Sequence, residues 1–272
     1  MAEEYNNFIK RILTIIISVP LVILIILWGQ FPLFILLIVL VSLGLNELFK
    51  MVRKIGFEPS IALGFILSFY FIGSIIINFY NLKFVYDKEI IIVFTVILYS
   101  FVQLFKKDYS KLLPNMSISI FSGIYLGYLS SFILKIKFLP NGDYFLLSLL
   151  FTIWVNDSAA YLVGTKFGKN KMCPRISPKK SLEGSIGGII FSILCVFILK
   201  NWLNLSFTKL IFLGLIIATI AQLGDLFESM IKRCSGVKDS SNIVPGHGGI
   251  LDCLDSILFT APVFYYYIIY LS

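Results

Sequence analysis

Residues 222–255 read QLGDLFESMIKRCSGVKDSSNIVPGHGGILDCLD; they follow an apolar run at 210–223 and lead into another at 257–271. The stretch combines acidic and basic residues with a glycine-rich turn, PGHGG, at 245–249. Ionised groups are costly to desolvate near a membrane, so a cluster of both signs beside apolar runs indicates a functional site. Carboxylates next to Lys and Arg suit one task especially well, which is to hold a divalent metal and a polyphosphate together.

The composition is that of a membrane protein. Hydrophobic residues make up 58% of the chain and charged residues 14%, whereas charged residues are about a quarter of a soluble domain, and the mean hydropathy is +0.92. A helix needs roughly 20 apolar residues to cross the hydrocarbon core. The sequence therefore predicts an all-α polytopic membrane protein with about nine transmembrane helices, at 11–28, 31–49, 61–80, 89–105, 117–137, 144–164, 185–201, 207–231 and 253–271.

The basic residues predict the orientation of these spans. With the N-terminus in the cytoplasm, only six of the 23 basic residues fall outside: Lys83, Lys88, Lys135, Lys137, Lys200 and Lys209. This asymmetry follows the positive-inside rule, and it puts the loops 165–184 and 232–249 in the cytoplasm together. The net charge of +8 is thereby explained by topology and attraction to anionic lipid. Nucleic-acid binding is not expected.

The chain is expected to form a single integral membrane domain over 1–272, with N-terminal spans at 1–140 and the catalytic loops within 141–272. The first span resembles a signal peptide, but its length and the lack of a small-residue cleavage site favour a retained anchor. The four cysteines show no C-x-x-C spacing and there is one histidine, so a zinc site is not expected.

Ionisable residues within and beside the last spans are the candidates for chemistry. Asp157 falls inside an apolar span, where carboxylates usually mark ion or substrate pathways, although an Asp paired with a neighbouring helix is the alternative. The loop KFGKNKMCPRISPKKSLEGS at 166–185 carries six basic residues. Topology alone would explain that loop, but Lys179 and Lys180 could neutralise phosphates if they share a side with the acidic cluster.

Two carboxylate pairs flank the glycine-rich turn. Asp225 and Glu228 lie three residues apart on one helix, and Asp252 and Asp255 lie three apart on the next. Asp255 could simply stabilise the start of its helix. Two such pairs brought together by a hairpin would repel unless a cation neutralised them, and Mg²⁺ suits a site with few carboxylates and substrate phosphate. His247 could either bind substrate or only hydrogen-bond its own loop.

At these residues the sequence resembles the CDP-diacylglycerol synthase family, also called phosphatidate cytidylyltransferases. Three motifs of that family occur here in the correct order over about the last 120 residues: D-S-x-A-Y-x-x-G, S-P-K-K-[ST]-x-E-G, and S-x-x-K-R-x4-K-D followed by P-G-H-G-G and D-R-x-D. They are matched by Asp157, Ser158, Ala160, Tyr161 and Gly164; by Ser177 to Ser181, Glu183 and Gly184; and by Ser229, Lys232, Arg233, Lys238, Asp239, Pro245 to Gly249, Asp252 and Asp255. The first half of the chain matches only as hydrophobic spans.

The resemblance implies an enzyme that joins CTP to phosphatidate in phospholipid biosynthesis, giving CDP-diacylglycerol and pyrophosphate, in a bacterial inner membrane and as a homodimer. The expected catalytic residues are Asp157, Asp225, Lys232 and Asp252. The expected Mg²⁺ ligands are Asp225, Asp252 and Asp255, with a second cation as an option. The expected substrate-binding residues are Lys179, Lys180, Ser181, Ser229, Arg233, Lys238, His247, Gly248 and Gly249.

One departure and two alternatives accompany this interpretation. Cys253 stands where the family has Arg in D-R-x-D; either Lys179, Lys180 or Arg233 supplies the lost charge, or activity is weakened. A CTP-dependent kinase or transferase acting on an ether lipid or a polyprenol is the closest alternative function. An ion-coupled transporter is the alternative from another class, but no internal repeat is visible and the charges gather at one membrane face.

Overall fold

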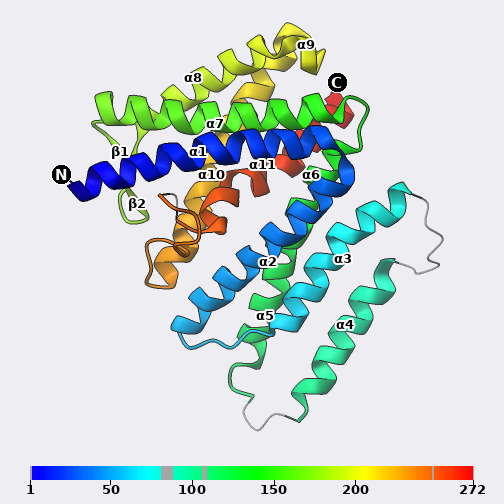
Figure 1. Cartoon of the computed structure of the whole chain (residues 1–272). Helices are drawn as coiled ribbons and strands as arrows, with labels where there is room; N and C mark the ends of the chain where they lie inside the picture. Colours follow the sequence, from blue (N-terminus) through cyan, green and yellow to red (C-terminus); the bar gives the residue numbers. More distant parts are fainter. Residues whose placement is uncertain (1, 81–87, 106–108, 247, 272) are drawn as a thin grey trace.

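The computed structural model describes residues 2–80, 88–105, 109–246 and 248–271. Helices dominate this part of the chain, and Figure 1 shows their arrangement. The elements are α1 (Ala2–Trp28), α2 (Gln30–Lys54), α3 (Ile61–Phe79), α4 (Lys88–Gln103), α5 (Leu112–Ser122), the π-helix η1 (Gly123–Tyr128), α6 (Leu129–Lys137), α7 (Gly142–Phe167), β1 (Lys171–Cys173), β2 (Ser177–Ser181), α8 (Leu182–Ile198), α9 (Lys200–Leu203), α10 (Phe207–Cys234) and α11 (Ile250–Leu271).

Among the described residues, six segments are long and apolar enough to cross a membrane: α2, α3, the continuous α5–η1–α6 segment, α7, α10 and α11. Three shorter apolar helices, Thr14–Trp28, Ile90–Gln103 and Leu182–Ile198, coincide with the other predicted spans. The prediction of an all-α polytopic membrane protein is therefore confirmed, while the count of about nine spans is not. The short β1–β2 hairpin was not predicted, because its basic residues resemble an ordinary polar loop.

Local sequence explains where several helices begin and end. Gly29 has φ +141° and is the single residue between α1 and α2; glycine adopts this backbone conformation without steric cost. Ser60 caps α3 by accepting from the Leu63 amide at 3.3 Å. Ser181 caps α8 in the same way, accepting from the Gly184 amide at 3.1 Å. Each serine supplies an acceptor to an amide that has no partner within its helix.

Helices α7 and α8 form an antiparallel pair joined by the hairpin (Figure 1). Glycines on α8 allow the close approach: a Cβ at Gly184 would lie 2.6 Å from the Ala160 carbonyl oxygen, and one at Gly187 would lie 2.7 Å from a methyl group of Val163. Small residues at a helix interface in a membrane let the backbones approach and gain van der Waals contact. The glycines of the S-P-K-K-[ST]-x-E-G region thus have a packing role.

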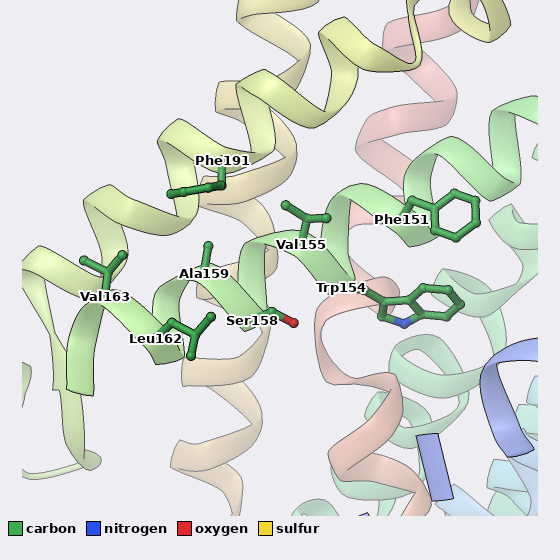
Figure 2. Close-up of a pocket in the computed structure, with 8 residues that line it drawn as sticks. All are labelled: Phe151, Trp154, Val155, Ser158, Ala159, Leu162, Val163 and Phe191. Carbon is green, nitrogen blue, oxygen red and sulfur yellow. The ribbon is translucent and has the colours of Figure 1, made fainter. Parts of the chain in front are cut away.

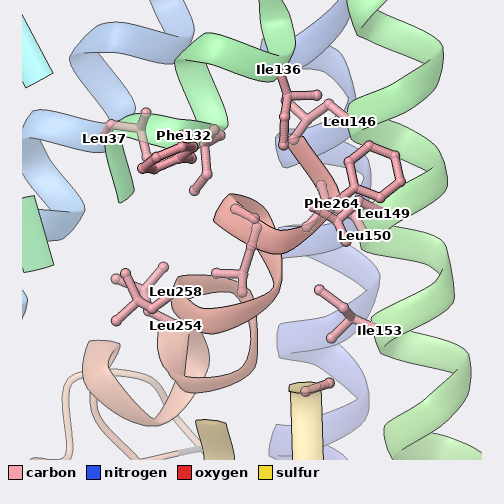
Figure 3. Packing of buried hydrophobic residues seen from close by; sticks show 14 of the residues in the cluster. Leu37, Phe132, Ile136, Leu146, Leu149, Leu150, Ile153, Leu254, Leu258 and Phe264 are labelled. Carbon is pink, nitrogen blue, oxygen red and sulfur yellow. The ribbon is translucent and has the colours of Figure 1, made fainter. Parts of the chain in front are cut away.

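A continuous apolar core joins the helices of the two halves. Figure 3 shows side chains of α6, α7 and α11 packed together, among them Phe132, Leu149, Leu258 and Phe264. All four are almost completely buried. Because α11 lies in this core, the start of α11 is held firmly with respect to α2, α6, α7 and α10.

The loops that carry the family motifs meet at one end of the bundle. The Arg233 side chain in the last turn of α10 donates from Nε to the Ile176 carbonyl oxygen of the hairpin at 3.1 Å. Thr14 of α1 donates to the Pro245 carbonyl oxygen at 2.8 Å, and the N-terminus lies on the hairpin side in Figure 1. The hairpin, the 235–249 loop and the N-terminal part of α1 therefore share one end.

Candidate active site

Lys232 connects two of the predicted acidic residues. Its ammonium forms ion pairs with Glu228, one turn earlier on α10 at 2.6 Å, and with Asp252 in the first turn of α11. The Glu228 side chain is 2% exposed and the Asp252 side chain 10%. A buried carboxylate needs a nearby cation or several hydrogen bonds, so Lys232 ties the ends of the two helices together.

Asp252 is also hydrogen-bonded to the loop before it. Its Oδ2 accepts from the Ser240 amide at 3.1 Å, the Ser240 hydroxyl at 2.7 Å and the Gly249 amide at 2.7 Å. A Cβ at Gly248, which has φ +112°, would lie 2.7 Å from the same oxygen. The glycines of PGHGG thus permit a close backbone approach to Asp252.

Lys180 of β2 forms an ion pair with Asp225 of α10, and both side chains are about one-third exposed. Asp225 also accepts from the Ser229 hydroxyl at 3.4 Å. Asp157 of α7 accepts from the Asn156 side-chain amide at 3.0 Å and is close enough to Asp225 and Lys180 to interact with them electrostatically. Three separate motifs thereby meet at one position.

Asp255 completes the acidic cluster. It accepts from the Ser256 amide at 2.5 Å, and it lies within electrostatic reach of Asp225, Glu228 and Asp157. The helices carrying it can approach closely because a Cβ at Gly224 would lie 2.5 Å from the Asp255 carbonyl oxygen. Five carboxylates, those of Asp157, Asp225, Glu228, Asp252 and Asp255, therefore share a small region that is served by the two ammonium groups already described.

Several predicted binding residues have visible local roles. Ser181 caps α8 as described above. Arg233 donates to the carbonyl oxygens of Ile176 and Val237 and so joins the hairpin to the 235–249 loop. Lys179 and Lys238 are exposed on the same end of the bundle. His247 lies outside the described residues.

Sequence reasoning missed two residues from the first half of the chain. Glu47 of α2 is buried and accepts four hydrogen bonds from the 240–251 segment. Tyr125 of the π-helix is 2% exposed and lies near Glu228 and Asp255. A π-turn inside an α-helix often marks a functional position, but no sequence signal distinguishes this turn from ordinary helix. For Glu47, the signal was an acidic residue within an otherwise apolar run.

A polar contact also joins three membrane helices beneath the cluster. Gln222 of α10 donates to the Asn156 side-chain oxygen of α7 at 3.1 Å and to the Ser185 carbonyl oxygen of α8 at 3.1 Å. The Ser185 hydroxyl donates back to Gln222. Buried amides that satisfy each other in this way fix the relative positions of helices in a membrane.

The donors at the site suit a hard divalent cation. Among the described residues no group of three or more His, Cys, Asp or Glu side chains is already arranged around one metal position. Within the same part of the chain, however, Oε1 of Glu228 is buried with no hydrogen-bond partner, beside an excess of carboxylates. Asp225 and Asp255 offer further oxygen atoms, and Oδ1 of Asp252, which faces Lys232, keeps a second lone pair, whereas Oδ2 already accepts three hydrogen bonds. Oxygen-only donors are those that Mg²⁺ prefers.

A groove of about 330 Å³ lies along α7 and α8. Its residues are near Asp157 in the sequence, but its lining is apolar. Figure 2 shows its lining, which includes Phe151, Trp154, Leu162 and Phe191, with the hydroxyl of Ser158 among them. This surface suits hydrocarbon and is unsuited to a nucleotide. The charged end of the bundle is the better candidate for binding phosphates.

The fold and the site define a polytopic membrane protein with acidic and basic groups gathered at one end of its helices. The chain belongs to the cytidylyltransferase family, whose sequence model matches residues 9–271. It is 33% identical to a phosphatidate cytidylyltransferase of Bacillus subtilis over 94% of this chain and 96% of the relative. It is 32% identical to the Synechocystis protein of that name, over 96% and 97%, and 33% identical to the Aquifex aeolicus one, over 82% and 81%.

Proposed function

We propose that this protein transfers the cytidylyl group of CTP to phosphatidate, giving CDP-diacylglycerol and pyrophosphate. The observation that carries the proposal is the meeting of three motifs: Lys180 pairs with Asp225, Lys232 pairs with Asp252, and Asp157 lies within electrostatic reach of the first pair. Full-length relatives that bear the name phosphatidate cytidylyltransferase support the same activity. An oxygen of the lipid phosphate attacks the α-phosphorus of CTP, and the bond to the β-phosphate oxygen breaks as pyrophosphate leaves.

The main task of the protein in this reaction is to overcome the repulsion between two anionic substrates and to align them. We assign phosphate binding to Lys179, Lys180 and Lys238, which lie at the open end of the bundle. Lys232 and Arg233 hold the loops in place and present positive charge towards the same region. The lipid phosphate is already deprotonated at neutral pH, so no general base is assigned.

We further propose that Asp225, Asp252 and Asp255 hold Mg²⁺, with Asp157 nearby and with Glu228 positioned for a second cation. When bound, Mg²⁺ supplies charge stabilisation for the attacking and leaving oxygens. The side chains of the chain itself keep the carboxylates converged: Lys180 orients Asp225, and Lys232 orients Asp252. Ser229 supports Asp225 from within the same helix.

The proposal includes the placement of the protein in the membrane. We propose that the three shorter apolar helices also cross the bilayer, which gives nine spans in one membrane domain with the catalytic loops in 141–272. The N-terminus and the site would face the cytoplasm of a bacterial inner membrane, as the basic residues indicate. The family resemblance leads us to propose a homodimer, which the mass of the detergent-solubilised protein would test.

Labelled CTP tests the reaction directly. Purified protein in detergent should convert phosphatidate to a lipid that carries label from the α-phosphate of CTP, with release of unlabelled pyrophosphate. Label from the γ-phosphate should not enter lipid. Transfer of γ-label to a lipid would instead identify a CTP-dependent kinase, and transfer of α-label only to a polyprenol phosphate or an ether-lipid phosphate would identify another substrate.

A further inference from the structure

Glu47 is a buried carboxylate near the end of α2, with an exposed fraction of 2%. Its Oε1 accepts from the Ser241 hydroxyl at 2.5 Å and from the Ile250 amide at 3.0 Å. Its Oε2 accepts from the Ser240 hydroxyl at 3.0 Å and from the Leu251 amide at 2.9 Å. All four donors come from one segment that lies about two hundred residues later in the chain.

These contacts hold the 240–251 segment at two positions, one near each of its ends. Ile250 and Leu251 open α11, where the first amides have no partner within the helix, and a carboxylate is favoured there by the helix dipole. The two serine hydroxyls belong to residues 240 and 241, which precede the PGHGG turn. Glu47 therefore holds the start of α11 and the segment before the turn relative to α2.

The same segment holds Asp252 in place. The Ser240 hydroxyl lies within hydrogen-bonding distance of both Glu47 and Asp252, at 3.0 Å and 2.7 Å. A Cβ at Gly249 would lie 2.5 Å from the Glu47 carboxylate, so only glycine lets the turn approach Glu47 this closely. Contacts thus continue from Glu47 through Ser240 to Asp252 and from there to Lys232.

We propose that Glu47 is a positioning residue: it holds the 240–251 segment and thereby sets the orientation of Asp252 at the transfer site. The catalytic part of this inference rests on the proposed function, whereas the anchoring of the loop does not. The N-terminal half of the chain, which the motifs leave without a role, thereby contributes to the site.

Hydrogen exchange in detergent tests the anchoring without any assay of activity. Glu47→Gln keeps the shape but replaces one acceptor with an NH₂ group, so an amide at 250–251 loses its partner. We expect exchange there to rise about tenfold or more, with exchange in α2 unchanged. Asn46→Ala is the matched control, because the Asn46 amide donates to Ser42 of its own helix at 2.9 Å; it should leave the loop unchanged.

Kinetics test the effect on the site. Glu47→Gln should lower kcat by about 10- to 100-fold, the equivalent of losing one hydrogen bond to a charged group, and should raise the Mg²⁺ concentration for half-maximal rate. Glu47→Asp keeps the charge and should recover part of both effects. A purely structural role would reduce the amount of active protein and leave the Mg²⁺ dependence unchanged. Should Glu47→Gln fail to fold, Ser241→Ala removes one of the four donors to Glu47, together with the acceptor of the Ile243 amide, and should show the same changes to a smaller degree.

The outcomes distinguish the anchoring of the 240–251 segment from the positioning of Asp252. Unchanged exchange at 250–251 in Glu47→Gln and in Ser241→Ala would overturn the anchoring. Faster exchange with unaltered kcat and Mg²⁺ dependence would overturn the positioning role. Absence of CTP-dependent transfer by the unmodified protein, with faster exchange in Glu47→Gln, would overturn the proposed function and leave the anchoring intact.

Discussion

Replacing Lys232 with methionine should destabilise the protein strongly, because the ammonium lies between two carboxylates. Glu228, at 2.6 Å, has a side chain that is 2% exposed, and Asp252 is 10% exposed. Removing one partner of a buried ion pair costs about 3–5 kcal/mol. For a chain of this size, a loss of 1 kcal/mol lowers Tm by roughly 2–4 °C, so Lys232→Met should lower Tm by roughly 6–20 °C.

The cause of that loss can be tested by a second change. Glu228→Gln in the Lys232→Met background removes one of the two stranded charges, while Asp252 keeps the donors of Ser240 and Gly249. The double variant should recover about half of the lost Tm without recovering catalytic activity.

Thermal unfolding in detergent, followed by size-exclusion chromatography, measures the Tm of the single and of the double variant. Lys238→Met serves as the control for stability, because Lys238 is exposed near the same end of the bundle, and its Tm should stay near that of the parent. The reasoning is refuted if Lys232→Met unfolds within about 2 °C of the parent, or if Glu228→Gln adds a further loss to it.

Three more predictions concern the loops and α11. Single cysteines in the β1–β2 hairpin and in 235–249, on a cysteine-free background, should be labelled from the same, cytoplasmic face; labelling from opposite faces would end the shared-site account. Cys253 is exposed between two acidic positions of α11, and we expect Lys180 to supply the charge that the family has there as Arg. Lys180→Ala should therefore lower kcat/KM strongly, and Cys253→Arg should recover part of the loss; additive losses in kcat/KM would contradict charge compensation. Gly249→Ala should abolish activity, because its Cβ would overlap neighbouring side chains, whereas Gly73→Ala, whose Cβ meets nothing within 4 Å, should remain active; equal rates in both would refute the steric argument.

The parts of the site that were predictable from sequence lie in motifs with short spacing. Asp225, Glu228 and Lys232 lie on one helix, and the turn that follows returns the chain so that Asp252 meets Lys232. Charged residues at the ends of apolar spans are rare enough to be informative. Placing both loops on one side predicted that Lys180 lies on the side of the acidic cluster, whereas its ion pair with Asp225 and the hairpin that carries it were not predicted.

The contribution of the first half could not be predicted in the same way. Glu47 acts on residues 240–251 through tertiary contacts, and a single acidic residue near a helix end is equally consistent with an exposed position at the interface. The π-turn that carries Tyr125 depends on how the glycines at 123 and 127 approach α3, and this is a property of packing. The capping role of Ser181 could be predicted from the sequence, since a serine before a helical run is a common N-cap.

The rate of transfer by the Asp225→Asn variant decides whether this acidic cluster is the transfer site. Asp225 forms an ion pair with Lys180 of one motif and accepts a hydrogen bond from Ser229 of another. The substitution keeps the shape of the side chain while removing its charge. Purified, folded protein should convert CTP and phosphatidate to CDP-diacylglycerol in the presence of Mg²⁺, and Asp225→Asn should lower kcat by about 100-fold or more with an unchanged elution profile. A rate within about threefold of the parent would contradict the account and place the chemistry elsewhere in the protein.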